Sequence, residues 1–164
     1  MTPQYSVSFI NPFLSAVVDV LGTMAMVEVS PGKPYINTRR TAAGDVTGII
    51  GVSGHAEGVI SLTLDEKCIL RIVSNMLGEE FSKITDDIAD AVGELTNMIA
   101  GQARAHLANE GMKFQASTPS VIVGKNHTLA HINKQPILAI PFTTADGNLV
   151  VEVSLNKVVD SPSA

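Results

Sequence analysis

Basic charge and cysteine are both scarce in this chain. It carries 11 Lys and Arg against 16 Asp and Glu, for a formal net charge of −5, and its only adjacent basic pair is Arg39-Arg40. Binding to nucleic acid needs clustered Lys and Arg, so this pattern argues against it. The lone Cys68 excludes a disulfide within the chain, and a cytoplasmic location is the default expectation. We interpret Cys68 as a buried core residue, with a nucleophile as the alternative.

Long apolar runs are missing as well. The mean hydropathy is +0.26, but the longest apolar candidate, residues 16–29, is interrupted by Asp19 and Glu28, so no membrane-spanning helix is expected. The N-terminus has no basic region and no clear signal peptide. A length of 164 residues with 45% hydrophobic residues predicts one folded domain over residues 1–164, with residues 160–164 as a frayed tail.

Several motifs of known chemistry are absent or incomplete. The glycine-rich stretch 44–58 lacks both the Gly-x-Gly-x-x-Gly order and the Gly-Lys-Ser/Thr ending of phosphate-binding loops, so its glycines are interpreted as strand ends and turns. His127 and His131 have a spacing that could bind metal on a helix, but their surroundings are typical of a loop, so no metal site is predicted. No Ser/His/Asp constellation can be assembled.

Apolar periodicity and capping residues divide the chain into elements. Asn11-Pro12 predicts the start of a first helix, because Asn is a favoured N-cap and Pro fits the first helical position. Thr85 predicts the N-cap of a long helix that reaches about Asn109 and ends at Gly111. The other predicted elements are a loop at Pro31-Gly32-Pro34, strands at 46–52 and 58–64, a short helix from Asp65 to Gly78, strands at 120–123, 137–143 and 149–155, and an Asp146-Gly147 turn.

The order of these elements predicts the fold class. Strands arrive in adjacent pairs rather than singly between helices. This favours an α+β fold, with a mostly antiparallel β-sheet and long helices packed on one face, over a doubly wound fold.

The long helix has two distinct faces on a helical wheel at about 100° per residue. Glu94 and Asn97 are neighbours on the face away from the core, because residues three apart lie side by side on a helix. Asp90, Gly101 and Arg104 share that outer side. The predicted core stripe consists of Ile88, Val92, Leu95, Ile99, Ala103 and His106.

The glycines on this helix, and the acidic residues on it and shortly before it, each allow two interpretations. Gly101 follows Asn97 by one turn and could let another surface come close, and Gly93 could serve packing against a neighbour. Alternatively, both glycines are merely tolerated. A cluster of acids is either a solvated surface or a partner-facing patch, and it comprises Glu79, Glu80, Asp86, Asp87, Asp90 and Glu94.

Residues 86–111 resemble the signature helix of the CheC/CheX/FliY chemotaxis phosphatases. The chain has one Glu-x-x-Asn signature, as CheX has, whereas CheC and FliY commonly have two. Other segments that resemble the family, in the same order, are Asn11-Pro12-Phe13, Asn75-Met76-Leu77-Gly78 and Pro119-Ser120-Val121-Ile122-Val123-Gly124. The resemblance covers nearly the whole chain and implies a CheC-like fold in its CheX form.

In that family the Glu and Asn of the signature helix are the working residues, and they match Glu94 and Asn97. The resemblance implies a phosphatase that hydrolyses the aspartyl phosphate of a CheY-like response regulator. Asn97 would position the attacking water, Glu94 would pair with the receiver's Lys, and Asp90, Gly101 and Arg104 would help to dock it. The receiver would supply Mg²⁺, this chain would bind no cofactor, and a homodimer is expected.

Two other functions remain open at this stage. A homodimeric binding module could dock a receiver or another signalling protein without turnover, although a scaffold has no need to keep both Glu94 and Asn97. A structural or sensory domain could share the fold, because fold alone does not fix function.

Overall fold

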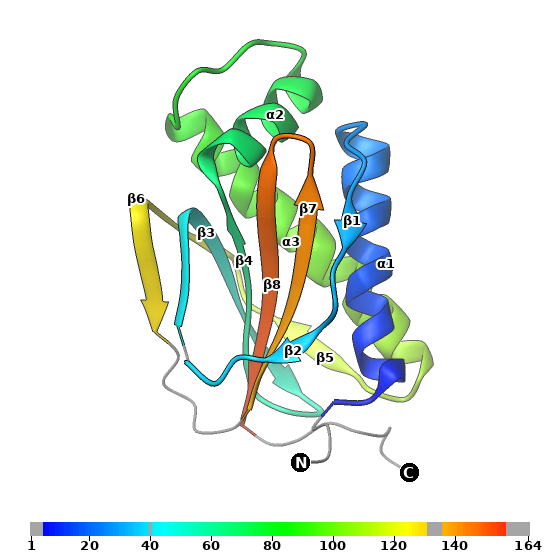
Figure 1. Ribbon diagram of the computed structural model, residues 1–164. Coiled ribbons are helices and arrows are strands. Elements are labelled where there is room, and N and C mark those ends of the chain that lie inside the picture. The colour runs from blue at the N-terminus through cyan, green and yellow to red at the C-terminus, as the bar shows by residue number, and fades with distance from the viewer. Residues whose placement is uncertain (1–4, 40, 131–135, 157–164) are drawn as a thin grey trace.

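A computed structural model of the chain describes residues 5–39, 41–130 and 136–156. Figure 1 shows the arrangement of its helices and strands. In chain order these are α1 (Val7–Met24), β1 (Ser30–Pro31), β2 (Tyr35–Ile36), β3 (Thr41–Gly54), β4 (Gly58–Leu64), α2 (Glu66–Leu77), α3 (Asp86–Asn109), β5 (Phe114–Ala116), β6 (Ser120–Ala130), β7 (Ile137–Thr144) and β8 (Gly147–Leu155).

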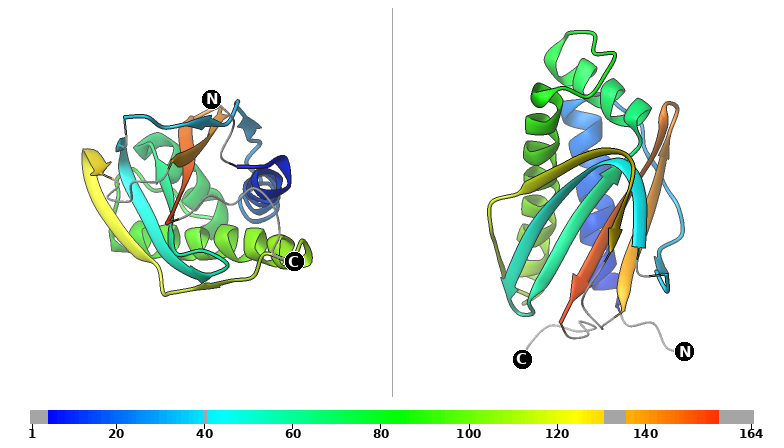
Figure 2. Two further views of the ribbon diagram at one scale, coloured as in Figure 1. Left: turned by 90° about the horizontal axis from the view of Figure 1, so that it is seen from below. Right: turned by 90° about the vertical axis from the view of Figure 1, so that its left-hand side faces the viewer.

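The strands form one sheet in the order β1-β7-β8-β4-β3-β5, with β2 also paired to β7 and β6 also paired to β3. All the strand pairs in the described residues are antiparallel. In the right-hand view of Figure 2, α1 and α3 lie to one side of the curved sheet and α2 covers its upper end. The predicted α+β class, with helices on one face, is confirmed.

Helix α1 is apolar because it is a core element. By length and composition it could cross a membrane, with a mean hydropathy of 1.5 over its 18 residues. This window begins before residues 16–29, the apolar stretch considered from the sequence, and so it contains Asp19 but not Glu28. Packing accounts for part of its apolar surface, because 39% of the helix is buried, against α3 and in the core: Phe9, Pro12, Phe13, Ala16, Val17, Val20 and Leu21.

The predicted start of α1 at Asn11-Pro12 is wrong. The helix begins at Val7, and Ser6 is its N-cap, with the side-chain oxygen of Ser6 accepting from the backbone N–H of Phe9 at 3.3 Å. Pro12 therefore lies inside the helix, where it cannot donate the usual backbone hydrogen bond. Burial of Phe9 and Pro12 against the core compensates for this loss.

Strands β3 and β6 are longer than predicted, and three further short strands were missed. The sequence predicted a strand only at 46–52 and another at 120–123, because glycine and polar residues beyond them are typical of loops. In the structure the two strands pair from Thr41↔Ala130 to Ile49↔Ser120, with a bulge between Gly44 and Val46. Strands β1, β2 and β5 form at the edges, two of them around the predicted Pro31-Gly32-Pro34 loop. The predicted turn before β8 is shifted by one residue, to Ala145-Asp146.

Asp45 holds this bulge against the start of α2. Its carboxylate accepts the backbone N–H of Glu66 at 2.8 Å and that of Asn126 at 2.9 Å. These two hydrogen bonds lower the pKa of Asp45 below its usual value of 3.8. Asp65, the N-cap residue of α2, makes no capping hydrogen bond with its side chain. The backbone N–H of Glu66, at the start of this helix, is instead paired with Asp45 from β3.

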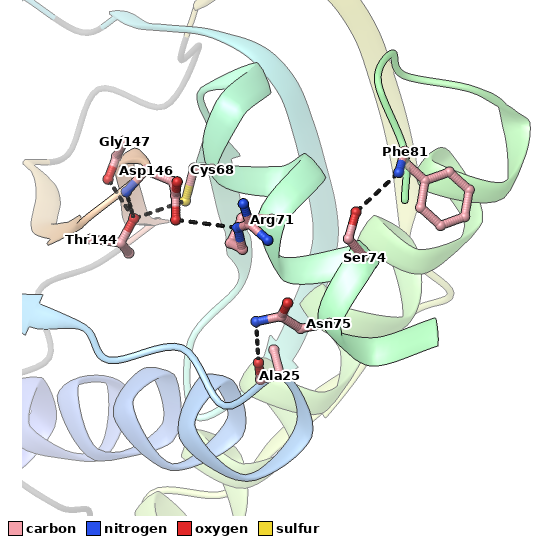
Figure 3. A network of polar contacts seen from close by, with 9 residues as sticks. All are labelled: Ala25, Cys68, Arg71, Ser74, Asn75, Phe81, Thr144, Asp146 and Gly147. Carbon is pink, nitrogen blue, oxygen red and sulfur yellow. Dashed lines mark hydrogen bonds and ion pairs between the residues drawn. The ribbon is translucent and has the colours of Figure 1, made fainter. Parts of the chain in front are cut away.

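The rest of α2 is fixed by side-chain contacts to three other segments, shown in Figure 3. Asn75 donates to the carbonyl of Ala25 at 2.8 Å, directly after α1. Arg71 pairs with Asp146 at 3.5 Å, and Ser74 accepts the backbone N–H of Phe81 at 3.1 Å. Gly78 ends the helix in the left-handed conformation, as predicted.

Candidate functional site

Helix α3 begins where the sequence predicted. Thr85 is the N-cap, and its hydroxyl accepts the backbone N–H of Ile88 at 3.4 Å. Asp86 and Asp87 occupy the first turn, where the positive end of the helix dipole favours negative charge. Packing against β3, β4, β5, β6, α1 and α2 holds this 24-residue helix rigidly along the sheet.

Glu94 and Asn97 lie together on the outer face of α3, and both are exposed. Neither side chain forms a hydrogen bond or ion pair with another residue that the structure describes. A carboxylate and an amide, one helical turn apart and without partners of their own, are thus presented to whatever meets this face. The predicted orientation of the pair is confirmed.

Two of the three predicted docking residues share this accessible face. Asp90 is exposed one turn before Glu94. Gly101 borders open space, since a Cβ added there would meet only the guanidinium of Arg104, at 3.9 Å. The space above Gly101 fits the interpretation that another surface can come close to Asn97.

Arg104, the third of these residues, turns toward β5 instead. One guanidinium nitrogen, Nη1, donates to the carbonyl of Phe114 at 3.5 Å. Nε of Arg104 is buried and has no hydrogen-bond partner among the described residues. The wheel places Arg104 on the outer side, but its long side chain folds along the end of the sheet, so the charge is only partly available to a partner.

The core stripe of α3 differs from the prediction at its end. His106 was predicted to face the core but is exposed, and Leu107 is buried in its place. Residues four apart lie on one face of a helix, so Leu107, four residues after Ala103, continues the buried face, and His106 lies outside it. Gly93 is buried, and a Cβ there would contact Val121 at 3.4 Å, which supports its predicted role in packing.

The acidic cluster is exposed throughout, at positions 79, 80, 86, 87, 90 and 94. Exposure is compatible with a solvated surface and with a partner-facing patch. Of these residues, Asp90 and Glu94 lie within about two helical turns of Asn97 on α3.

The structure shows the surroundings of two residues that were considered for other sites, His127 and Cys68. His127 lies in β6, not in a loop, and its ring contacts Thr47 Oγ1 at 2.6 Å and the Gly124 carbonyl at 2.8 Å. His131 lies outside the described residues. Among the described residues, no group of three or more His, Cys, Asp or Glu could hold a metal ion. Burial raises the pKa of the Cys68 thiol to about 11, so it is protonated near neutral pH and unsuited to act as a nucleophile.

Comparisons with known proteins place this chain among the chemotaxis proteins. The family model described as "Chemotaxis phosphatase CheX" matches residues 46–143. The chain belongs to the CheX family. The matched span includes the whole of α3, and therefore both Glu94 and Asn97. The predicted family is thus confirmed, together with the CheC-like fold.

Individual CheX relatives match over most of the chain. The CheY-P phosphatase CheX of Thermotoga maritima is 25% identical over 118 residues, 71% of this chain and 76% of that protein. The crystal structure of a chemotaxis protein CheX from Desulfovibrio desulfuricans is 46% identical, with a TM-score of 0.86 over 91% of this chain and 99% of that one. The CheX in a CheX-CheY-BeF3-Mg²⁺ complex from Borrelia burgdorferi is 30% identical, with a TM-score of 0.76 over 91% and 98%.

Two residues behind the CheX signature were not noticed in the sequence. Thr96 lies between Glu94 and Asn97 in the chain but is buried, and it faces Gly48 on β3. Gly48 was interpreted only as one member of a glycine-rich stretch. A glycine inside a strand can mark a close approach of another element, but the sequence does not say which element approaches.

Proposed function

We propose that this chain is a protein phosphatase that hydrolyses the aspartyl phosphate of a CheY-like response regulator. The observation that carries the proposal is the exposed Glu94/Asn97 pair, which lies within the family match and has no partner among the described residues. The proposal gains support from one relative that is named a CheY-P phosphatase and another that was crystallised with CheY.

The main task of the phosphatase in this reaction is to position the attacking water. An acyl phosphate is already reactive, and the receiver brings its own Mg²⁺ and Lys, which neutralise charge on the phosphoryl oxygens. What remains is to hold a water in line with the phosphorus. The Asn97 amide can both donate and accept a hydrogen bond and does not titrate, so it can orient that water at any physiological pH.

Glu94 fixes the docking register in this proposal. Its carboxylate pairs with the Lys of the receiver, and hydrogen bonds between charged groups are the stronger kind. Because Glu94 and Asn97 lie on one rigid helix, fixing one side chain on the receiver also places the other. Asp90 and Gly101 would border the docked surface, whereas the contact of Arg104 with Phe114 favours a structural role for that side chain.

Three further expectations stay predictions. These are a homodimer, a cytoplasmic location, and the absence of a cofactor bound by this chain. Sedimentation of the purified protein would test the first of them directly.

The decisive experiment measures phosphate release from a Mg²⁺-loaded, phosphorylated receiver with and without this protein. We expect acceleration by the wild type, and a loss of about 100-fold or more in Asn97→Ala, because the water is no longer positioned. Glu94→Ala should lower both the affinity for the receiver and the rate. Asn109→Ala is the matched control, since it makes the same change at an exposed position on the same helix.

The outcomes separate the candidate functions. Full activity in Asn97→Ala and Glu94→Ala would remove these residues from the mechanism. Tight binding to the receiver without acceleration would favour the binding module, and failure to bind any receiver from the same organism would favour a structural or sensory domain.

A further inference from the structure

Helix α3 lies close against β3 at Thr96, the residue directly before Asn97. A Cβ added at Gly48 of β3 would overlap the hydroxyl oxygen of Thr96 and would lie 2.9 Å from the Cβ of Thr96 and 3.3 Å from its Cγ2. Carbon atoms normally pack at about 3.5–4.0 Å. Only glycine therefore lets α3 lie at its present depth on β3.

The side chain of Thr96 is itself held in one orientation. Its hydroxyl donates to the carbonyl of Val92, one turn earlier, at 2.7 Å. The residue is 2% exposed, and Gly48 is buried beneath it. Thr96 is thus a fixed contact point between α3 and the sheet rather than a flexible filler.

A second contact point lies three residues earlier on the same face. A Cβ at Gly93 would meet Val121 of β6 at 3.4 Å, and Val121 pairs with Gly48 in the sheet. Each exposed residue of the pair directly follows one of these contacts, Glu94 after Gly93 and Asn97 after Thr96. Two contacts three residues apart fix both the depth and the rotation of the helix, and so they fix the direction of the two side chains that follow them.

We propose that the Gly48–Thr96 contact is a positioning device, which keeps α3 undistorted at Thr96 and so fixes where Asn97 lies relative to Glu94 and to a receiver docked on Glu94. This inference rests on the proposed phosphatase function. A Cβ at position 48 would have to displace α3 at Thr96 by roughly 1 Å to reach ordinary packing distance, and this local distortion would move Asn97 relative to Glu94. A misplacement of that size can lower a rate by about 100-fold without any loss of the reacting groups.

The test compares Gly48→Ala with its compensated double variant, Gly48→Ala/Thr96→Ala, which removes the overlapping hydroxyl. We expect Gly48→Ala to lower kcat for receiver dephosphorylation by about 100-fold, while KM and binding of a beryllofluoride-loaded receiver change less than about threefold. The double variant should recover only part of the activity, because the Cβ of residue 96 stays 2.9 Å from the added Cβ while the closer overlap with the hydroxyl is gone. Gly51→Ala is the matched control, because it lies on the same strand with its Cβ toward Ser117 rather than α3, and should stay within about twofold of wild type.

A second pair of variants tests the contact from the helix side, in case Gly48→Ala does not fold. Thr96→Val puts a methyl group in place of the hydroxyl against Gly48, and Thr96→Ser keeps the hydroxyl. We expect Thr96→Val to lose at least about threefold in kcat and Thr96→Ser to retain wild-type kcat.

The outcomes distinguish the positioning role from the phosphatase function. An active wild type with equal kcat in Gly48→Ala and Gly51→Ala, or with unchanged kcat in Thr96→Val, would overturn the positioning role alone. An inactive wild type would overturn the function. In that case a crystal structure of Gly48→Ala still tests whether this contact positions α3. We expect α3 to be displaced at Asn97 in that structure, and a helix in its wild-type position would overturn the positioning role.

Discussion

Cys68 shows how burial at a single residue changes reactivity. Its thiol is 1% exposed on α2, and the hydroxyl of Thr144 contacts its sulfur at 3.9 Å. The thiolate is the reactive form, and burial raises the pKa of this thiol to about 11, compared with about 8.5 for an unfolded cysteine. We expect alkylation by iodoacetamide at pH 8 to be at least about 100-fold slower in the native protein than in urea. Since this is the single cysteine, mass spectrometry follows it directly, and equal rates would contradict its burial.

At the scale of elements, Asp45 joins β3, β6 and α2 through one carboxylate. Because its pKa is lowered by folding, the stabilisation is present above the unfolded value near 3.8 and is lost as pH falls through the folded value. Asp45→Asn should therefore lower the free energy of unfolding at pH 7, by no more than about 1 kcal/mol because solvent screens this lightly buried carboxylate. The difference in Tm from wild type should shrink below about pH 4. Glu79→Gln, an exposed loop control, should match wild type across this range. A pH-independent difference for Asp45→Asn would reject the role of its charge.

At the scale of the whole molecule, aromatic packing connects segments that are far apart in the chain. The ring of Phe9 on α1 lies 5.4 Å from that of Phe13 and 6.5 Å from that of Phe114 on β5, and Tyr5 donates to the Pro136 carbonyl at 2.7 Å. Phe9→Ala should lower the free energy of unfolding by about 3–5 kcal/mol, because it leaves a cavity in this shared core. Urea unfolding followed by circular dichroism and by tyrosine fluorescence should give one coincident transition. Val7→Ala, with Val7 70% exposed on the same helix, is the control and should change little.

The sequence by itself determined the features that depend on neighbouring residues. Thr85 and the acids after it define the start of α3, and helical periodicity turns Glu94 and Asn97 away from the core. The bounds of β4, and the end of α2 at Gly78 in the left-handed conformation, likewise follow from neighbouring residues. Caps, turns and periodicity act within a few residues, so they can be inferred without knowing the fold.

Only the tertiary structure decided the features that depend on distant residues. The start of α1 needs the core around Phe9, the length of β6 needs β3 beside it, and Arg104 turns because β5 lies within its reach. Gly48 and Thr96 are 48 positions apart in the sequence, and each is unremarkable until α3 lies across β3. Local rules therefore place Glu94 and Asn97 on the outer face of α3, while the depth at which the two residues are held follows from packing between segments that no local pattern relates.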